Sequence, residues 1–367
     1  MMFLRRLSLL MLLAVNLPCL ASANRTKTDS LTRVMEKVYN WQWNNLETNG
    51  WKRRKTDWTY GVMYAGMMDW ARFSPDKTYL NNLVSVGNSI DWRIGPERSF
   101  ADDYCIGQTY AELSAINKDP RYIQDFRKMA DSLVQADHSE SLLWVKNIHT
   151  REWAWCDALF MGPAALGQLS KATGDKRYRD LAVSLWWKTT NYLYDKNERL
   201  FYRDSRYFDK QEKNGTKVFW SRGNGWVLAG LVRLLETIPS NDKARKPLIK
   251  LYQQMAGRVA ALQQADGTWH ASLLDPQSYP NKETSGTGLF CFALAYGINH
   301  HLLPSKQYLP VVNKAWAALV SSVHPDGKLG YVQPVGASPD KVTYDDTDVY
   351  GPGAFLMAGV QMAALQK

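Results

Sequence analysis

The sequence predicts an all-α protein of the (α/α)6 barrel class, a closed double ring of six helical hairpins. Apolar periodicity and helix-breaking residues divide the chain into twelve helical segments. These segments alternate between helices rich in small residues and amphipathic helices, which face solvent on one side. Six enclosed helices alternating with six half-exposed ones fit a closed double ring, and an open α-solenoid is the structural alternative.

The first 23 residues have the pattern of a signal peptide. Arg5 and Arg6 precede an apolar run from Leu7 to Leu17, and Ala21-Ser-Ala23 has the small-x-small pattern of a cleavage site. The run is too short to span a membrane comfortably, and Pro18 before Cys19 argues against lipidation. Residues 1–23 are therefore expected to be removed and the protein exported to the periplasm or the medium, with no membrane anchor.

Residues 24–367 contain no linker or composition break, so one catalytic domain is expected there. The expected helices, in chain order, are 28–46, 58–73, 76–93, 102–117, 120–137, 154–173, 175–193, 223–237, 245–264, 284–299, 308–323 and 350–365.

The even-numbered segments are expected to form the inner ring, because their small side chains permit close packing. Examples are Tyr60-Gly-Val-Met-Tyr-Ala-Gly66 and Met161-Gly-Pro-Ala-Ala-Leu-Gly167. Four odd-numbered segments open with a helix-start signal followed by tyrosine, as in Asp119-Pro-Arg-Tyr122. Their amphipathic pattern assigns them to the outer ring.

Charge and composition narrow the function. The chain has a net charge of +10, which becomes +8 without the leader, and the cations are spread along it. That distribution argues against nucleic acid and suits an anionic small substrate. Cys105, Cys156 and Cys291 show no metal-ligand spacing, and neither do the six histidines, so no metal and no cofactor are expected.

In a double ring, the loops leading into the inner helices open on one face. Those loops carry aromatic and acidic residues rather than the usual Gly, Ser and Asn, which predicts a sugar site with carboxylates beneath it. The residues concerned include Trp58, Tyr60, Asp102, Asp103, Trp153, Trp155, Asp157, Trp220, Arg222, Trp226, Glu283 and Tyr350.

Asp157 is the first catalytic candidate. It lies in Trp153-Ala-Trp-Cys-Asp157-Ala-Leu-Phe-Met161, which offers almost no polar neighbour, so the carboxyl could hold a proton near neutral pH. The structural alternative is a helix N-cap. Asp102 and Asp103 offer two further acids, of which one is expected to cap a helix and the other to face the site.

Trp220-Ser-Arg222-Gly-Asn-Gly-Trp226 sets a guanidinium between two indoles. Arginine can bind a carboxylate with two parallel hydrogen bonds, and indole faces can stack on sugar rings. A structural cation–π cluster is the alternative. Tyr344-Asp-Asp-Thr-Asp348 looks only loosely like a calcium loop, because it lacks the glycine and the distal glutamate.

These motifs resemble those of the unsaturated rhamnogalacturonyl hydrolases, glycoside hydrolase family 105. The resemblance rests on Asp102-x4-Gly107, Trp155-x-Asp157-x-Leu-Phe-Met161, Trp220-x-Arg222-x3-Trp226 and Glu283-Thr-Ser-Gly-Thr-Gly288. It implies that Asp157 is the general acid/base and Asp102 the second active-site aspartate. It also implies a set of substrate-binding residues, namely Trp58, Tyr60, Asp103, His149, Met161, Arg203, Trp220, Arg222 and Trp226. Arg203 stands where family members often carry a histidine.

The resemblance implies removal of 4,5-unsaturated galacturonic acid from the non-reducing end of pectin oligosaccharides left by lyases. The reaction would hydrate the C4=C5 double bond rather than displace at the anomeric carbon. The alternatives are an unsaturated glucuronyl hydrolase of family 88 type acting on glycosaminoglycan or ulvan fragments, an ordinary inverting glycosidase or a sugar epimerase on the same fold, and a noncatalytic sugar-binding protein.

Overall fold

A computed structural model describes residues 17–366, with side-chain surroundings from residue 29 onward. The expected all-α class and the twelve helices are confirmed within that range. The helices are α1 Leu17–Asn49, α2 Trp58–Phe73, α3 Thr78–Ser89, α4 Gly107–Asn117, α5 Gln124–Val134, α6 Ala158–Thr173, α7 Lys176–Leu193, α8 Ser221–Leu235, α9 Arg245–Ala261, α10 Thr284–Asn299, α11 Ser305–Ser321 and α12 Tyr350–Ala364.

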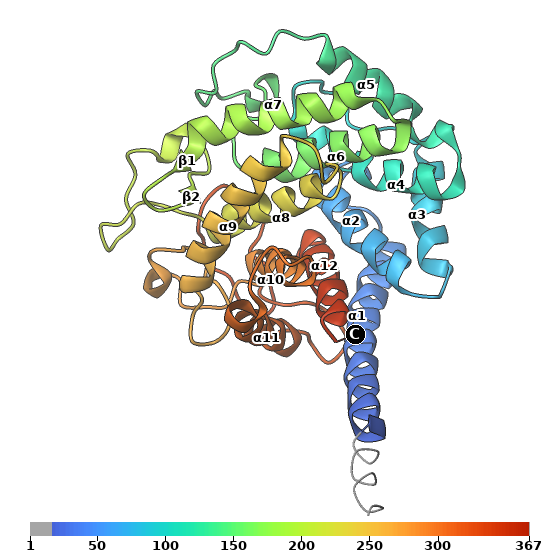
Figure 1. The fold of residues 1–367 in the computed structure, drawn as a ribbon, viewed down its shortest axis with the longest axis vertical. Coiled ribbons are helices and arrows are strands. Elements are labelled where there is room, and N and C mark those ends of the chain that lie inside the picture. Colours follow the sequence, from blue (N-terminus) through green and yellow to red (C-terminus); the bar gives the residue numbers. More distant parts are fainter. Residues whose placement is uncertain (1–16, 367) are drawn as a thin grey trace, which may run out of the picture.

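The even-numbered helices form the inner ring. Each contacts the next in the order α2, α4, α6, α8, α10, α12, and α12 returns to pack on α2. Helices α1, α3, α7, α9 and α11 each pack on an inner helix from outside, and α5 packs on α7 and on the turn before it (Figure 1). This closed circuit is the (α/α)6 barrel and excludes the open solenoid.

Burial follows the alternation predicted from composition. Every residue of α10 from Thr284 to Ile298 is buried. In α5 the buried residues are Phe126, Ala130 and Leu133, whose spacing marks one face of a helix. The inner helices are thus enclosed by neighbours on both sides, whereas the outer helices bury a single stripe.

The ring closes where two glycines meet. A Cβ atom placed on Gly66 of α2 would overlap the backbone of Gly353 of α12, and one on Gly353 would lie 2.6 Å from the carbonyl oxygen of Val62. Only glycine permits helix backbones to approach so closely. The small residues that identified the inner helices are therefore needed at the seam between the first and the last of them.

Differences from the expected helices are local. The segment expected as one helix from residue 102 begins as a 3₁₀ turn, η1 Ala101–Tyr104, and a second 3₁₀ turn, η2 Pro120–Ile123, precedes α5. Short strands β1 Tyr194–Asp195 and β2 Leu200–Phe201 form an antiparallel hairpin after α7. The remaining 3₁₀ turns are η3 Ile148–Thr150, η4 Ser205–Tyr207 and η5 Pro276–Ser278.

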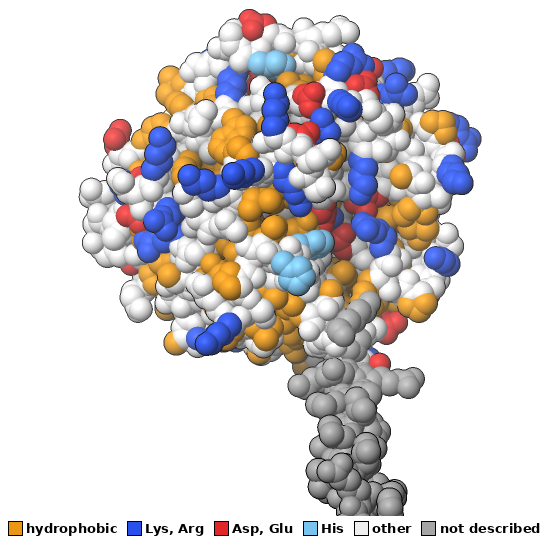
Figure 2. All heavy atoms as spheres, in the orientation of Figure 1, with side chains coloured by type: hydrophobic (Ala, Val, Ile, Leu, Met, Phe, Trp, Pro, Cys, Tyr) orange, Lys and Arg blue, Asp and Glu red, His pale blue; other side chains and the backbone are white. Residues whose placement is uncertain are grey.

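The expected signal peptide, residues 1–23, lies for the most part outside the described residues, and α1 begins at Leu17 rather than at the expected residue 28. Among the described helices, none combines the length and the apolarity that crossing a bilayer requires. Cys105, Cys156 and Cys291 are free and buried, as small apolar side chains are expected to be. Lys and Arg side chains are scattered over the face shown in Figure 2, with acidic side chains between them.

At one end of the ring, the C-terminal turns of the inner helices surround a hollow of about 660 Å³. Arg233 of α8 lies beside it, buried among carboxylates: Nη2 is 2.7 Å from Asp69 Oδ2. Nη1 is 3.9 Å from carboxylate oxygens of both Glu112 and Glu236. Burial raises the pKa of Glu236 to about 7. The charge of Arg233 opposes this rise, and the charge of Asp69 adds to it.

This raised pKa predicts how stability depends on pH. Native Glu236 binds a proton more tightly than the unfolded chain does, so its contribution is greatest below the ordinary glutamate pKa and is lost as pH rises towards about 7. We expect the stability advantage of Glu236→Gln over the wild type to grow by about 1 to 2 kcal/mol between pH 5 and pH 8. Urea unfolding at both pH values measures it. The control is Glu198→Gln, because Glu198 pairs with Arg258 at the outer surface. A stability advantage of Glu236→Gln that does not change with pH would contradict the prediction.

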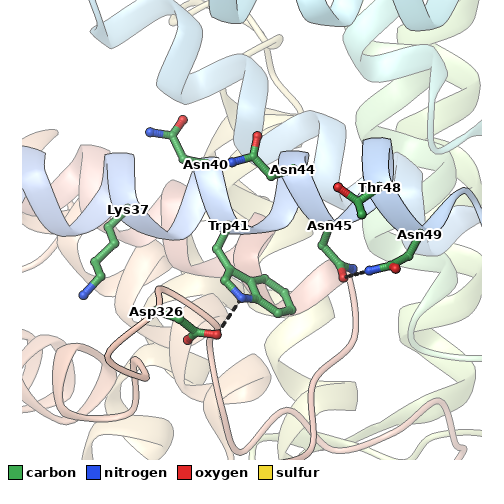
Figure 3. A pocket seen from close by; sticks show the side chains of 8 residues that line it. All are labelled: Lys37, Asn40, Trp41, Asn44, Asn45, Thr48, Asn49 and Asp326. Atoms are coloured by element: carbon green, nitrogen blue, oxygen red, sulfur yellow. Dashed lines mark hydrogen bonds between the residues drawn. The ribbon is translucent and has the colours of Figure 1, made fainter.

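A second hollow, of about 400 Å³, lies between α1 and the turn at Asp326. Figure 3 shows it lined by Trp41, whose Nε1 donates to Asp326 Oδ2 at 2.9 Å, and by amide side chains of α1. None of the residues predicted for the sugar site lines it.

Candidate active site

Residues from five of the six inner-helix starts gather at the end of the ring opposite Arg233. Asp102 lies in η1 just before α4, Asp157 immediately before α6, and Trp220 immediately before α8. Trp58 and Tyr350 are the first residues of α2 and α12. The predicted convergence of these segments is what a closed ring produces, because its inner helices all run in the same direction.

Asp102 is a half-buried carboxyl that interacts electrostatically with Asp157 and Arg203. Burial raises its pKa well above the usual aspartate range, the neighbouring Asp157 charge adds to the rise, and Arg203 opposes it. The surroundings of Asp102 therefore favour its protonated form more than water does, and part of its surface stays open to solvent.

Asp157 lies beside a guanidinium. Its Oδ2 accepts a hydrogen bond from Arg203 Nε at 3.1 Å and lies 3.6 Å from the thiol sulfur of Cys156. Its side chain makes no N-capping hydrogen bond, which removes the structural alternative. The expectation that Asp157 lacks polar neighbours is wrong, because Arg203 arrives from a segment 46 residues further along the chain.

The structure also separates the two adjacent acids. Asp103 is 4% exposed, and its Oδ2 accepts a hydrogen bond from the backbone N–H of Glu97 at 2.7 Å. Its oxygens hold the loop that precedes η1, and Gly95 packs against its carboxyl group. Asp102 is thus the acid that faces the site, and the substrate-binding role expected of Asp103 is not supported.

Arg222 is enclosed, contrary to the expectation that it meets a substrate carboxylate. It is 0% exposed. Its Nη1 donates to Tyr350 Oη at 2.9 Å and to the carbonyl oxygen of Gln333, and Nη2 donates to the carbonyl oxygen of Pro334 at 2.9 Å. Trp220 stacks on the guanidinium with its ring centre 4.5 Å away. Arg222 joins α8 to α12 and to residues 333–334, so the structural alternative describes it better.

The aromatic residues form a layer rather than an open platform. Trp58 stacks on Tyr350 with ring centres 5.3 Å apart, and both rings contact Trp226 edge-on. Trp58 keeps partial exposure, whereas other residues expected to touch substrate are at most 2% exposed, namely Tyr60, Met161, Trp220 and Trp226. Those four are enclosed in this structure, and Trp58 is the member of the aromatic layer that keeps exposed surface.

His149 lies at the rim, on η3, and is exposed. Its ring contacts Phe100 edge-on at 6.4 Å, and Phe100 leans on Trp155 at 5.5 Å. These ring contacts link His149 through Phe100 to the segment that carries Asp157. The substrate-binding role expected of His149 stays a prediction.

Two features escaped the sequence interpretation. Asp204, 0% exposed, accepts hydrogen bonds from Arg203 and Arg206, and Trp144 covers both guanidinium groups. The sequence signal for this cluster was the charge alternation Arg203-Asp-Ser-Arg206.

The second feature is a run of four cations, Lys52-Arg-Arg-Lys55, in the loop before α2. Arg53 of this run pairs with both oxygens of Asp348, next to the start of α12. This run is a local exception to the even spread of charge. The run is held next to the start of α2, where Trp58 lies. Asp57, the N-cap of α2, donates its backbone N–H to the carbonyl oxygen of Arg54 at 2.8 Å.

Across the described residues, no group of three or more His, Cys, Asp or Glu side chains has metal-binding geometry. Asp348 of the segment with a loose likeness to a calcium loop is paired with Arg53.

Comparison with known proteins places this arrangement in a family. The family model described as Glycosyl Hydrolase Family 88 matches residues 29–366. The chain is 39% identical, over 85% of each chain, to a protein of Formosa agariphila named unsaturated 3S-rhamnoglycuronyl hydrolase. It is 33% identical to a protein of that name from Alteromonas sp., over 91% of this chain and 86% of the relative.

Two solved structures are similarly close in fold. A structure titled as glycosyl hydrolase family 88 from Bacteroides vulgatus is 29% identical, with a TM-score of 0.81 and coverage of 92% of this chain and 99% of that one. Another, titled as a polysaccharide lyase, is 29% identical, with a TM-score of 0.82 and coverage of 92% and 97%. The resemblance to unsaturated-uronyl hydrolases is confirmed: the chain belongs to Glycosyl Hydrolase Family 88 and is a glycosidase.

Proposed function

We propose that the protein removes a 4,5-unsaturated uronic acid from the non-reducing end of lyase-generated oligosaccharides by hydrating the C4=C5 double bond. The observation that carries the proposal is the pair of carboxyls, Asp102 and Asp157, beside the cation Arg203. We also propose that the protein acts after export, with residues 1–23 as its leader.

The carboxyl pair suits the proton transfers of a hydration. One proton must be delivered to C4 while water adds at C5, and the water must lose a proton. The resulting hemiketal opens and leaves a hemiacetal at C1, which releases the remaining sugar. We assign the transfer to Asp157, in keeping with the motif resemblance. Asp102 is the neighbouring carboxyl, and burial and the Asp157 charge raise its pKa.

We assign to Arg203 the binding of the uronate carboxylate, a role that the sequence interpretation gave to Arg222. In the substrate, C4 and the carboxylate carbon are both bonded to C5, so a cation that binds the carboxylate must lie beside the acid that protonates C4. Arg203 meets that condition, because its Nε contacts Asp157 at 3.1 Å. Its Nη2 forms no hydrogen bond within the described residues, which leaves a donor for the uronate.

The candidate substrates differ in the sugar to which the unsaturated uronic acid is linked. Elimination abolishes the stereocentre at C4, so unsaturated galacturonic and glucuronic rings are the same ring, and selectivity must come from linkage and the adjoining sugar. Rhamnose appears both in the names of the two relatives and in the rhamnogalacturonan substrate implied by the motifs. We propose unsaturated galacturonyl-rhamnose from pectin as the substrate.

A sulfated rhamnose is the second candidate. The two relatives carry "3S-rhamnoglycuronyl" in their names. In this chain, Lys52 and Arg54 are exposed in the loop beside Trp58, and their side chains form no ion pair among residues that the structure describes. Such cations would favour a sulfate ester on the sugar that follows the uronic acid.

The proposed function predicts turnover of unsaturated disaccharides and none of their saturated counterparts. We expect loss of the ultraviolet absorbance of the conjugated enol with unsaturated galacturonyl-rhamnose, and incorporation of one solvent deuterium at C4 in D₂O. Comparison with unsaturated glucuronyl-rhamnose 3-sulfate ranks the two candidates.

The isolated keto product, incubated in D₂O without enzyme, controls for exchange at C4. Efficient cleavage of the saturated substrate would overturn hydration and indicate an ordinary inverting glycosidase.

A further inference from the structure

Asp204 belongs to a chain of four alternating charges that leads away from the site. Arg203 donates from Nε to Asp157 and from Nη1 to Asp204 Oδ2, at 3.1 and 2.8 Å. Asp204 also accepts from Arg206, through Nη2 at 2.8 Å and Nε at 2.9 Å. The exposed fractions of the side chains are 13% for Arg203, 0% for Asp204 and 39% for Arg206, so the chain runs from the site to the surface.

The cluster is fixed by contacts on several sides. The ring of Trp144 lies 3.6 Å from the Arg206 guanidinium and 4.9 Å from that of Arg203. The backbone N–H of Trp144 donates to Ser205 Oγ at 2.9 Å, and the carbonyl oxygen of Arg203 accepts from Cys156 N–H at 2.8 Å. The segment carrying Arg203 is thereby joined to the residue before Asp157.

A proton carrier next to a single buried cation faces an energetic conflict. If Asp157 were the sole anion beside Arg203, protonating Asp157 would leave a largely buried guanidinium without a counter-ion, which is strongly unfavourable. Asp204 removes that conflict. Burial works against the Asp204 carboxylate, but hydrogen bonds from Arg206 and Arg203 outweigh burial and lower the pKa of Asp204, so it stays ionised.

We propose that Asp204 is a positioning residue that gives Arg203 a permanent counter-charge, so that Asp157 can gain and lose a proton without leaving Arg203 unpaired. This inference rests on the proposed function for its kinetic consequences, whereas the electrostatic arrangement exists without substrate. The charged groups that surround the carboxyl pair and the adjoining Cys156 thiol are Arg203, Asp204, Asp103 and Asp57. Asp204 is the one among them whose carboxylate is bound to Arg203.

Asp204→Asn tests the proposal through the pH–rate profile. Without the Asp204 charge, Arg203 holds the ionised form of Asp157 more strongly, so the acid is unprotonated over more of the pH range. We expect the alkaline limb of kcat to move to lower pH by about one unit, with activity at neutral pH reduced and partly recovered in acid. KM for the uronide should change less than kcat.

The matched control is Asp69→Asn, which removes a carboxylate from buried Arg233 at the other end of the ring, where the Nη2–Oδ2 distance is 2.7 Å. It should lower stability without moving the pH limb. Arg206→Gln, at a more exposed position, removes a cation instead and should move the limb to higher pH, which keeps the test open if Asp204→Asn does not fold. A limb unmoved in both cluster variants would overturn the proposal and leave Asp204 a structural residue.

A titration without substrate separates this inference from the proposed function. ¹³C-carboxyl aspartate labelling, with the Asp157 and Asp102 signals assigned by Asp157→Asn and Asp102→Asn, follows the pair directly. A downward shift of the pair's titration in Asp204→Asn supports the counter-charge role even if the wild type hydrolyses neither unsaturated disaccharide. An unchanged titration refutes the role even if hydration is observed.

Discussion

Asp157→Asn is expected to lower kcat on the unsaturated disaccharide by about 10²- to 10⁴-fold, the contribution of a positioned proton carrier. Asparagine is nearly isosteric with aspartate, and its amide oxygen can still accept the hydrogen bond that Arg203 Nε donates at 3.1 Å in the wild type. The substitution therefore removes the exchangeable proton with little change of shape. Initial rates from the loss of enol absorbance, together with a thermal unfolding curve, measure both properties.

The control for this substitution is Asp209→Asn, at an exposed position outside the site. It should leave both rate and stability unchanged. Full activity in Asp157→Asn would eliminate Asp157 as the proton carrier. If Asp102→Asn alone abolished turnover in that case, Asp102, whose pKa burial raises, would take the role.

Arg222→Lys is expected to lower the free energy of unfolding by about 3 kcal/mol, because buried hydrogen bonds from a charged donor are lost and their acceptors stay enclosed. Lysine keeps the charge but cannot reach Tyr350 Oη and the carbonyl oxygens of Gln333 and Pro334 in the planar arrangement that arginine provides. Urea unfolding, with its dependence on denaturant concentration compared between variants, measures the change.

Arg121→Lys is the matched control, since the side chain of Arg121 is 80% exposed. It should leave the free energy of unfolding nearly unchanged. Unchanged stability of Arg222→Lys together with weakened binding of the unsaturated uronide would return Arg222 to the substrate-binding role that its sequence context suggested.

The sequence was sufficient for the ring because the ring depends on patterns within single helices. Small residues such as Gly66 marked helices with neighbours on both sides, and an amphipathic stripe such as Phe126, Ala130 and Leu133 marked an outer helix. Once the inner helices were identified, closure of the ring brought their starts together. Asp102 and Asp157 could therefore be placed at one end without any contact information.

Accessibility could not be predicted in the same way, because loops distant in sequence decide it. Arg222 is enclosed by Gln333 and Pro334, which follow it by 111 and 112 residues and carry no pattern that indicates where they fold. Asp102 and Asp103 are adjacent in sequence, and the backbone of Glu97 determines which of them points away from the site. Arg203 reaches Asp157 from the segment just after the β1–β2 hairpin, which periodicity did not reveal.

The glycine seam between α2 and α12 has a consequence for the order in which the molecule can be made. Gly66 and Gly353 are 287 residues apart, and Gly353 belongs to α12, which is synthesised after the other described helices. At typical rates of synthesis, roughly 15 to 60 seconds pass between the two glycines. Throughout that interval α2 lacks its final neighbour, and the nascent chain cannot complete its barrel.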